Sequence, residues 1–368
     1  MRFPEFSGEW ETKSINDLAD VIGGGTPDTT VKSYWDGGIQ WFTPSEIGKN
    51  KFVDASLRTI TEDGLNNSSA KLLPPNTLLL SSRATIGECS LSLRECATNQ
   101  GFQSLVSKNC NVDFLYYLIQ TKKKDLIRKS CGSTFLEISA NEVRKIQVSV
   151  PSDVEQQKIA ELLSLIDKRI ATQNKIIEDL KLLKSAISLN VLHSGTWKQF
   201  KIKDIAQIGR GRVISSIEIS QQKNPTYPVY SSQTSNDGIM GYLDDYMFEG
   251  EYISWTTDGA NAGTVFYRDG KFNCTNVCGL LKLLNGFDTH FVSLILAEAT
   301  KKYVSINLAN PKLMNNIMGN IQICLPEFEE QKRISIVFKK LQELLDVQKI
   351  LLNQYSKQKQ CLLRQMFI

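Results

Sequence analysis

Residue types that could carry out chemistry are few in this chain and widely separated. Of its two histidines, His193 and His290, neither lies near a pattern of serine and aspartate or of metal ligands. Cys274 and Cys278 are the most closely spaced cysteines, and a structural zinc site would need a second such pair. No G-x-x-x-x-G-K-[ST] loop for nucleotide phosphates occurs. We therefore expect no catalytic residue and no metal site.

One motif resembles a substrate site. Asn224-Pro225-Thr226-Tyr227 is similar to the Asn-Pro-Pro-Tyr motif with which amino-methyltransferases hold a flipped base. Here Thr226 replaces the second proline, and no strand, glycine loop and helix that could hold a methyl donor precede it. We interpret the motif as a loop that leads into a strand at Pro228-Val229-Tyr230.

Side chains that can hydrogen-bond to nucleic acids are common in the segments that we expect to be loops. They gather at Ser81 to Thr85 and Thr98 to Gly101 in the first half, and at Ser231 to Asn236 and Thr256 to Asn261 in the second. Arginine, asparagine, glutamine, serine and threonine contact base edges and phosphates. The same residues stabilise turns through local hydrogen bonds, so each one taken alone favours the structural role.

Composition sets broad limits on the class of protein. A chain of 368 residues, 41% hydrophobic and 22% charged, can form two domains with buried cores. No run approaches the roughly 20 apolar residues of a membrane helix, and the N-terminal residues lack the plan of a signal peptide. Eight scattered cysteines favour reduced thiols, so we expect a cytoplasmic protein with no membrane partner. The net charge of +4 neither supports nor excludes a nucleic-acid partner.

The chain repeats itself. A displacement of 175 positions brings Glu155-Gln156-Gln157-Lys158-Ile159 onto Glu330-Gln331-Lys332-Arg333-Ile334, and the alignment continues without a gap for about fifty residues. The starts of the two copies also match, because Trp10-(x)4-Ile15-x-Asp17-Leu18 corresponds to Trp197-(x)4-Ile202-x-Asp204-Ile205. Between these ends the copies diverge, which indicates one scaffold that presents two different surfaces.

Each copy ends in a segment with the pattern of a long amphipathic helix. Proline and glycine are absent from residue 152 to about residue 192, and apolar residues recur seven positions apart, as in a coiled coil. A helix of about 40 residues is about 60 Å long. The main row of apolar positions consists of Ile159, Ile166, Gln173, Leu180 and Ile187 in the first helix and of Ile334, Leu341, Gln348, Tyr355 and Leu362 in the second.

A glutamine interrupts both rows at the same place. If the helices run antiparallel, Gln173 and Gln348 meet at the middle, and a hydrogen bond between their amides would cost stability but fix the register. Alternatively, both glutamines lie at the edge of the contact in solvent. His193-Ser194-Gly195 is expected to end the first helix.

The regions before the helices are typical of mixed α/β modules with many short strands. Glycine-rich turns separate apolar segments such as Leu78-Leu79-Leu80 and Tyr252-Ile253-Ser254-Trp255. Shorter helices are expected at 112–129 and 287–303. We divide the chain into a first module at 1–150, a helix at 151–193, a second module at 194–325 and a helix at 326–368.

Taken together, these features resemble the specificity subunit of type I restriction-modification systems over essentially the whole chain. The repeated Pro…Glu-Gln-x-x-Ile opening of each helix carries most of the resemblance. The other segments are each modest alone but specific in their order along a duplicated chain, and they are Gly24 to Pro27, Tyr34 to Pro44, Thr98 to Gly101, Tyr230 to Gln233, Gly238 to Tyr242 and Thr257 to Thr264.

The resemblance implies an α+β fold with two mixed α/β target-recognition domains, each followed by a long helix. The helices would pair as an antiparallel coiled coil with pseudo-twofold symmetry and act as a spacer between the two halves of a split site in double-stranded DNA. Two modification subunits that methylate adenine with S-adenosylmethionine would assemble around the spacer. Restriction subunits that use ATP and Mg²⁺ would join them, while this chain would be non-catalytic and bind no cofactor.

We predict that the loops supply the DNA contacts. The candidates are Trp41, Thr43, Ser81, Arg83, Thr85, Asn99 and Gln100 in the first domain and Ser231, Ser232, Gln233, Thr234, Asn236, Thr257, Asp258 and Asn261 in the second. Some family segments could equally be scaffold, because residues shared by proteins that read different sequences cannot all choose bases.

Two other functions stay open at this point. A self-contained adenine DNA methyltransferase would have to work with the degenerate Asn-Pro-Thr-Tyr motif and without a methyl-donor loop. A coiled-coil scaffold with two modules that bind carbohydrate or peptide would need no DNA. Absence of salt-dependent DNA binding by the assembled complex would favour the scaffold.

Overall fold

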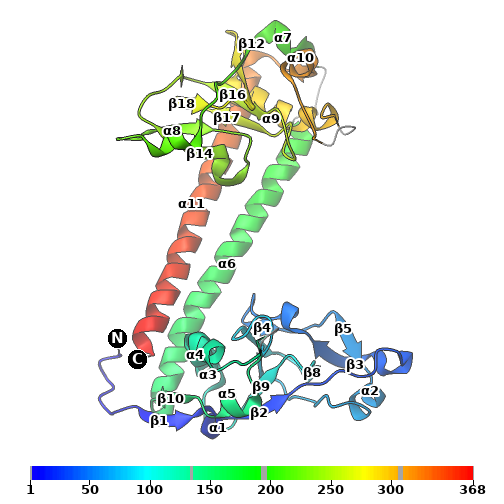
Figure 1. Cartoon of the computed structure of the whole chain (residues 1–368), viewed down its shortest axis with the longest axis vertical. Coiled ribbons are helices and arrows are strands. Elements are labelled where there is room, and N and C mark those ends of the chain that lie inside the picture. Colours follow the sequence, from blue (N-terminus) through cyan, green and yellow to red (C-terminus); the bar gives the residue numbers. More distant parts are fainter. Residues whose placement is uncertain (1, 133–135, 192–196, 306–309, 368) are drawn as a thin grey trace. The chain divides into compact units, whose positions relative to one another are not determined.

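The computed structural model describes residues 2–132, 136–191, 197–305 and 310–367, and the chain divides into two compact units (Figure 1). Unit 1 comprises Met1–Lys175 and Lys349–Ile368, and unit 2 comprises Ile176–Gln348. Each unit therefore contains one globular module and a part of both long helices. The predicted helix end at His193-Ser194-Gly195, with the predicted boundary between residues 193 and 194, lies outside the described residues.

Unit 1 is built from a two-stranded, a five-stranded and a three-stranded sheet. The first pairs β1 (Glu11–Ser14) antiparallel with β10 (Gln147–Val150). The others have the orders β2 (Ala19–Gly23), β9 (Gln103–Ser107), β6 (Leu78–Leu80), β7 (Cys89–Ser92), β4 (Phe52–Val53), and β5 (Arg58–Ile60), β3 (Trp35–Phe42), β8 (Cys96–Thr98). The short helices are α1 (Ile15–Leu18), α2 (Glu62–Asn66), α3 (Val112–Thr121), α4 (Lys123–Arg128) and α5 (Ala140–Arg144).

Unit 2 has a two-stranded and two four-stranded sheets. The first pairs β11 (Lys198–Lys201) antiparallel with β20 (Gln322–Leu325). The others have the orders β12 (Ala206–Arg210), β19 (Cys278–Leu283), β16 (Tyr252–Thr256), β17 (Val265–Arg268), and β14 (Ile239–Leu243), β13 (Tyr227–Tyr230), β18 (Lys271–Cys274), β15 (Phe248–Glu249). The short helices are α7 (Ile202–Ile205), α8 (Ser216–Ser220), α9 (Thr289–Ala299) and α10 (Asn315–Asn320).

The two units share one strand plan, although their sequences diverge between the repeated ends. The series β2, β9, β6, β7 of unit 1 corresponds to β12, β19, β16, β17 of unit 2. In the other sheet, β3 pairs parallel with β8 and antiparallel with β5, as β13 does with β18 and β14. Between β3 and β5, unit 1 has the 3₁₀ turn η2 (Pro44–Glu46) followed by residues 48–52 and β4, whereas between β13 and β14 unit 2 has the 3₁₀ turn η3 (Ser235–Gly238). We call residues 48–52 the added segment. The mixed α/β prediction is confirmed, and the divergent middles fold alike.

The predicted helices are present with small changes. The segment predicted at 112–129 is divided at Lys122 into α3 and α4, and the segment predicted at 287–303 is α9 followed by the 3₁₀ turn η4 (Thr300–Lys302). The long helices are α6 (Asp153–Val191) and α11 (Phe328–Met366). None of the helices in the described part of the chain combines the length and the hydrophobicity of a membrane-spanning segment.

A buried glutamine fastens each long helix to its module. Gln156 accepts a hydrogen bond from the backbone N of Asn111 (2.9 Å) and donates one to the carbonyl oxygen of the proline that precedes α6 (3.0 Å). Gln331 makes the same two bonds, with the backbone N of Asp288 (3.0 Å) and with the proline that precedes α11 (2.9 Å). The strongest repeated motif of the sequence is therefore a structural joint.

The helices pair antiparallel, as predicted. In unit 1, Ile159 near the start of α6 lies in the same core as Leu362 near the end of α11. In unit 2, Ile187 near the end of α6 packs against the core that contains Ile334 near the start of α11. Among the other predicted apolar positions of this contact, Ile166 is buried, and Leu180, Leu341 and Tyr355 are partly buried.

The interrupting glutamines are not both in solvent. Gln173 is 6% exposed, which contradicts the alternative that it lies at a solvated edge, and Gln348 is partly buried. The two residues belong to different units, so their mutual hydrogen bond stays a prediction.

Candidate nucleic-acid interface

Four loops of unit 1 begin where β2, β3, β6 and β8 end, and we call them loop cluster 1. Gly25 N donates to Thr98 O (2.8 Å), and Asn99 N donates to the carbonyl oxygen of the last residue of β3 (3.1 Å). Ser82 N donates to Gly101 O (2.8 Å). These bonds join all four loops into one surface, which consists of residues 24–27, 43–47, 81–88 and 99–102.

Unit 2 repeats this arrangement at the ends of β12, β13, β16 and β18, and we call it loop cluster 2. Arg212 N donates to Cys274 O (3.2 Å), and Thr275 N donates to the carbonyl oxygen of the last residue of β13 (2.9 Å). Thr257 N donates to Val277 O (3.1 Å). The backbone frame is therefore the same in both units, and its loops are residues 211–215, 231–238, 257–264 and 275–277.

The first loop of each cluster requires a glycine. A Cβ on Gly24 would lie 2.0 Å from the carbonyl oxygen of Asn99, and a Cβ on Gly211 would lie 1.7 Å from that of Cys274. No side chain fits in either place, because real Cβ atoms do not approach backbone this closely. Gly24 lies in a segment, Gly24 to Pro27, that carries the family resemblance. Its counterpart Gly211 lies in none of these segments, so the sequence did not indicate its role.

Three predicted DNA contacts have buried side chains, and we reassign them to the frame. Trp41 Nε1 donates to Gly25 O (2.9 Å), and its ring meets that of Trp35 edge-on. Ser81 Oγ donates to the carbonyl oxygen of Arg83 (2.8 Å). Thr257 Oγ1 lies 3.0 Å from the carbonyl oxygen of Val277, which accepts from the Thr257 backbone N, and it donates its hydroxyl proton to Asp258 Oδ2 (2.7 Å). These side chains hold the loops from beneath, so they are not free to meet a ligand at the surface.

The other candidates reach the surface, and the structure leaves their DNA role a prediction. Several already bond within the clusters: Asn99 Oδ1 accepts from Gly101 N (2.9 Å), Gln100 accepts from Thr26, and Gln233 donates to the backbone of Ile239. Thr85, Gln100, Thr234, Asn236 and Asn261 are exposed, whereas Thr43, Arg83, Asn99, Ser231, Ser232, Gln233 and Asp258 are partly exposed.

A buried arginine that the sequence reasoning missed holds the second loop of loop cluster 2. Arg268 has a side chain 2% exposed, and it donates from Nη1 to a carboxylate oxygen of Asp237 and from Nη2 to its carbonyl oxygen, both at 2.9 Å. The guanidinium also lies 3.6 Å from the ring centre of Tyr230. Asn236 and Asp237 adopt left-handed backbone angles (φ 49° and 54°), which this arginine helps to hold. An arginine within a strand gives no local signal of such a partner.

Loop cluster 2 also carries a cation that is already paired. Arg212 Nη1 donates to Glu218 at 2.9 Å, and this hydrogen bond lowers the pKa of the Glu218 carboxyl below its usual value. Both side chains are open to solvent, so the pair can exchange the carboxylate for a phosphate at little cost.

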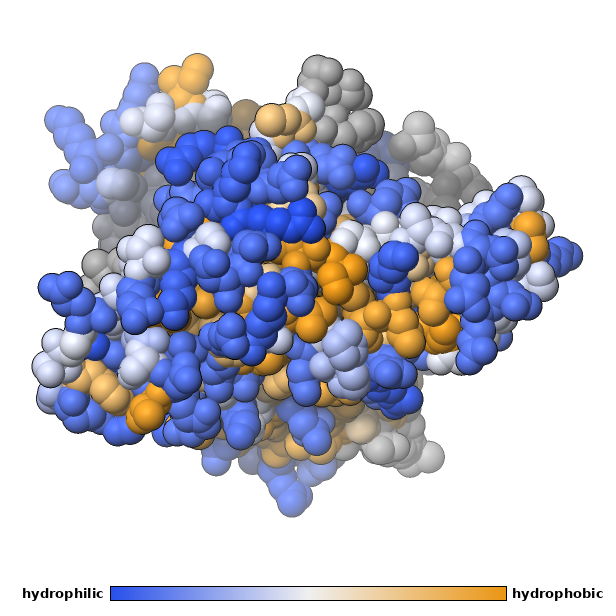
Figure 2. All heavy atoms as spheres, turned by 90° about the horizontal axis from the view of Figure 1, so that it is seen from below, coloured by the Kyte–Doolittle hydropathy of each residue, from blue (hydrophilic) through white to orange (hydrophobic). Residues whose placement is uncertain are grey.

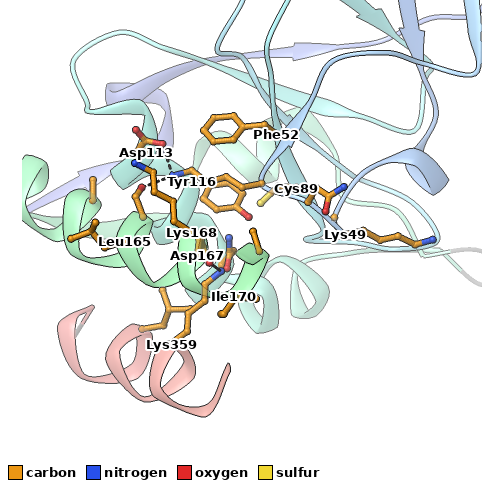
Figure 3. Close-up of a pocket in the computed structure, with 18 of the residues that line it drawn as sticks. Lys49, Phe52, Cys89, Asp113, Tyr116, Leu165, Asp167, Lys168, Ile170 and Lys359 are labelled. Atoms are coloured by element: carbon orange, nitrogen blue, oxygen red, sulfur yellow. Dashed lines mark hydrogen bonds and ion pairs between the residues drawn. The ribbon is translucent and has the colours of Figure 1, made fainter. Parts of the chain in front are cut away.

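Unit 1 contains a groove of about 1180 Å³ between the added segment 48–52, α3, the first half of α6 and the end of α11 (Figure 3). Lys51, 9% exposed, lies at its wall with Nζ 2.6 Å from Asp113 Oδ1, 2.7 Å from Ser164 Oγ and 3.1 Å from Tyr117 Oη. Burial raises the pKa of the nearby Cys89 thiol to about 12, so this thiol is protonated and a poor nucleophile at neutral pH. Across the residues that the structure describes, no group of His, Cys, Asp and Glu could hold a metal ion. Because Lys51 contacts Asp113, Tyr117 and Ser164, we interpret it as the residue that holds the added segment against α3 and α6.

Comparisons with known proteins come from sequence and from structure. The sequence model of a family described as "Type I restriction modification DNA specificity domain" matches residues 7–182 and 194–354. The type I restriction enzyme MjaIX specificity subunit of Methanocaldococcus jannaschii is 38% identical over 182 residues, which cover 47% of this chain and 42% of that subunit. The N-terminus of a putative type I specificity subunit from Mycoplasma pneumoniae is 44% identical over 142 residues, which cover 38% of this chain and 75% of that protein.

A solved structure matches along nearly the whole length. The crystal structure of a type I restriction-modification S subunit from M. genitalium covers 100% of this chain and 99% of its own, with a TM-score of 0.67 and 17% identity. At that identity the match establishes the fold. The two family matches fall on the two repeats, so each loop cluster lies within one of them.

Proposed function

Because this chain belongs to the type I restriction-modification DNA specificity family, we propose that it is a specificity subunit that reads a split target in double-stranded DNA. Loop cluster 1 reads one half of the target, and loop cluster 2 reads the other. The chain selects the sequence and leaves the chemistry to other subunits.

The duplicated loop clusters carry this proposal. Equivalent backbone bonds hold four loops at the same strand ends in both units, while the side chains on those loops differ. Two domains that recognise different DNA sequences need the same backbone support but different side chains on their loops. Base edges are distinguished by the hydrogen-bond donors and acceptors that contact them.

The paired helices support a spacer role for α6 and α11. A 39-residue helix is about 58 Å long at 1.5 Å per residue. Such a helix spans well over one turn of DNA, which is about 34 Å long. We infer that the length of the two helices sets the number of unread base pairs between the two half-sites.

Exposed apolar side chains on the long helices support docking of partner subunits. Single exposed apolar residues are common, but a series along one element is typical of an interaction surface. Figure 2 views the molecule from below, and on that face it shows hydrophobic residues gathered between hydrophilic surroundings. We assign two modification subunits, which carry S-adenosylmethionine, and restriction subunits, which use ATP and Mg²⁺, as the partners of this complex. The exposed residues are Leu165, Ile176, Leu182, Leu183 and Leu189 on α6 and Ile336, Val337, Leu344, Val347 and Ile350 on α11.

The proposal is favoured over a self-contained methyltransferase by the surroundings of the Asn-Pro-Thr-Tyr motif. Asn224 N donates to Asp244 Oδ1 (2.8 Å), and Thr226 Oγ1 donates to the carbonyl oxygen of Asn224 (3.0 Å), which are the bonds of an exposed turn before β13. A scaffold for carbohydrate or peptide is disfavoured by the family matches on both repeats.

Deleting the gene and mapping methylated adenines in the genome tests the proposal. We expect one split motif to lose its methylation and to regain it when the gene is restored. Purified complex with the modification subunits should methylate the same motif, and the isolated chain should methylate nothing. Methylation by the isolated chain, or by the modification subunits without it at the same motif, would overturn the proposal.

A further inference from the structure

The loop that follows β6 or β16 carries an ion pair close to its first residue in each unit, and in unit 1 the last residue of the loop, Glu88, forms a second pair with Lys123. In unit 1, Arg83 Nη2 lies 2.8 Å from Glu137 Oε2. In unit 2, Lys312 Nζ lies 3.6 Å from Asp258 Oδ1. At the pair close to the start of the loop, the loop therefore contributes the positive partner in unit 1 and the negative partner in unit 2.

The two pairs occupy equivalent positions. In each unit the loop residue bridges antiparallel to its ion-pair partner, and the neighbouring residues are joined by a backbone hydrogen bond of 3.1 Å in unit 1 and 2.8 Å in unit 2. Arg83 and Asp258 are 175 positions apart, and so are Glu137 and Lys312. That displacement also aligns the two long helices, so one structural site holds opposite charges in the two units.

We propose that Arg83 and Asp258 are matched specificity determinants, which make the two units prefer different base edges at equivalent places of their half-sites. This inference rests on the proposed function. A guanidinium is a fork of donors that fits the O6 and N7 acceptors of guanine. A carboxylate only accepts, as from the N4 amino group of cytosine. Reversing the charge at one site therefore changes which base is favoured.

The partner in each pair orients the reading group. The side chain of Arg83 is 43% exposed, and its contact with Glu137 through Nη2 leaves other N–H groups of the five in a guanidinium for a base. Asp258 Oδ2 accepts from Thr257 Oγ1 (2.7 Å), which fixes the carboxylate plane beside Lys312. Exposed ion pairs add little stability, so stability gives no reason for opposite signs in two otherwise matching loops.

Exchanging the charges within a pair tests this inference, because the attraction survives while the reading group changes. Arg83→Asp with Glu137→Lys would be assembled with the modification subunits, and methylated adenines would be sequenced in a library of random sites. We expect the preference at one or two adjacent positions of one half-site to change by about 10-fold or more, with the other half-site and the spacing unchanged. Asp258→Arg with Lys312→Glu should alter only the other half-site.

A matched control separates reading from general charge effects. Arg94 and Asp54 form an exposed arginine–aspartate pair in unit 1 outside loop cluster 1, with Nε 2.5 Å from Oδ1. Arg94→Asp with Asp54→Arg should leave both half-sites as they are. If this control alters the same positions as the exchange at Arg83, the assignment is wrong.

An unchanged motif in an exchanged complex that still methylates would overturn the inference and leave the proposed function intact. If the exchanged complex is inactive, Arg83→Gln with Glu137→Gln decides, because the pair stays hydrogen-bonded without charge. Relaxed preference at one or two positions supports the inference, and an unchanged motif contradicts it. Failure of the unaltered complex to methylate any split motif would instead contradict the proposed function.

Discussion

Helices α3 and α9 occupy the same place in the two units but carry different chemistry at their second residue. Their N-caps, Asn111 and Asp288, each accept a hydrogen bond from the backbone N of a phenylalanine three positions later. Two positions after the cap stands Asp113 in unit 1, bound to Lys51 of the added segment. In unit 2 the position is His290, whose Nδ1 lies 3.0 Å from Ser335 Oγ on α11.

This difference shows what duplication has kept and what it has left free. The cap, the glutamine joint and the strand ends are common to both units, because they position a module against its helix. The side chain two positions after the cap differs between the units because it contacts different elements, the added segment in unit 1 and α11 in unit 2. The common parts form the frame, and changes to them should act alike in both units.

The largest effect is expected from lengthening the two long helices, to which both modules are attached. Inserting seven residues into α6 beside Gln173 and seven into α11 beside Gln348 adds about 10 Å to the spacer. We expect methylation of the original motif to be lost and a motif with the same half-sites and about three more unread base pairs to appear, since DNA rises 3.4 Å per base pair. Sequencing of methylated adenines checks this, and altered half-sites would show that the helices are not the ruler.

The next effect concerns the glycine shared by both loop clusters. Gly211→Ala forces a Cβ against the carbonyl oxygen of Cys274, and we expect it to lower the free energy of unfolding by about 1–3 kcal/mol and to abolish reading of one half-site. Gly24→Ala should do the same to the other half-site. Gly209→Ala is the control, because a Cβ there meets nothing within 4 Å. Equal denaturation midpoints for Gly209→Ala and Gly211→Ala would contradict the shared role.

Sequence predicted the frame better than the surface. The spacing of Ile159, Ile187, Ile334 and Leu362 predicts the paired helices, because helical periodicity is a local property of the chain. The loop clusters depend on contacts between distant segments, so Trp41 looked like an exposed contact and is a buried support. Arg268 gave no signal at all, since its partner lies 31 positions away and no pattern links them.

Lys51 pairs with Asp113 in unit 1, whereas His290 stands at the equivalent place in unit 2, so removing Lys51 should affect unit 1 alone. Lys51→Met leaves Asp113 without its cation, and we expect unit 1 to lose about 1–2 kcal/mol of stability while unit 2 is unaffected. Faster amide hydrogen exchange in α3 but not in α9 would report this. Lys49→Met, at an exposed position of the same segment, is the control and should change neither helix. Equal exchange in α3 of both variants would mean that Lys51 does not clamp the segment.

The last effect is a pH dependence that His290 should give to unit 2. Burial, with help from the charge of Lys339, lowers the pKa of His290 from its ordinary 6.5 to about 4, although Asp288 and Glu251 oppose the shift. The unfolded chain therefore takes up a proton below about pH 6.5 that the folded chain refuses until about pH 4, so stability contributed by His290 is lost as pH falls through this window. Protection factors in α9, which correct for the slower intrinsic exchange at lower pH, should fall between pH 6.5 and 4, and those in α3 should fall less. His290→Gln keeps a hydrogen-bonding group for Ser335 and should remove the extra loss of protection in α9. If the extra loss persists in His290→Gln, another group in unit 2 is responsible for it.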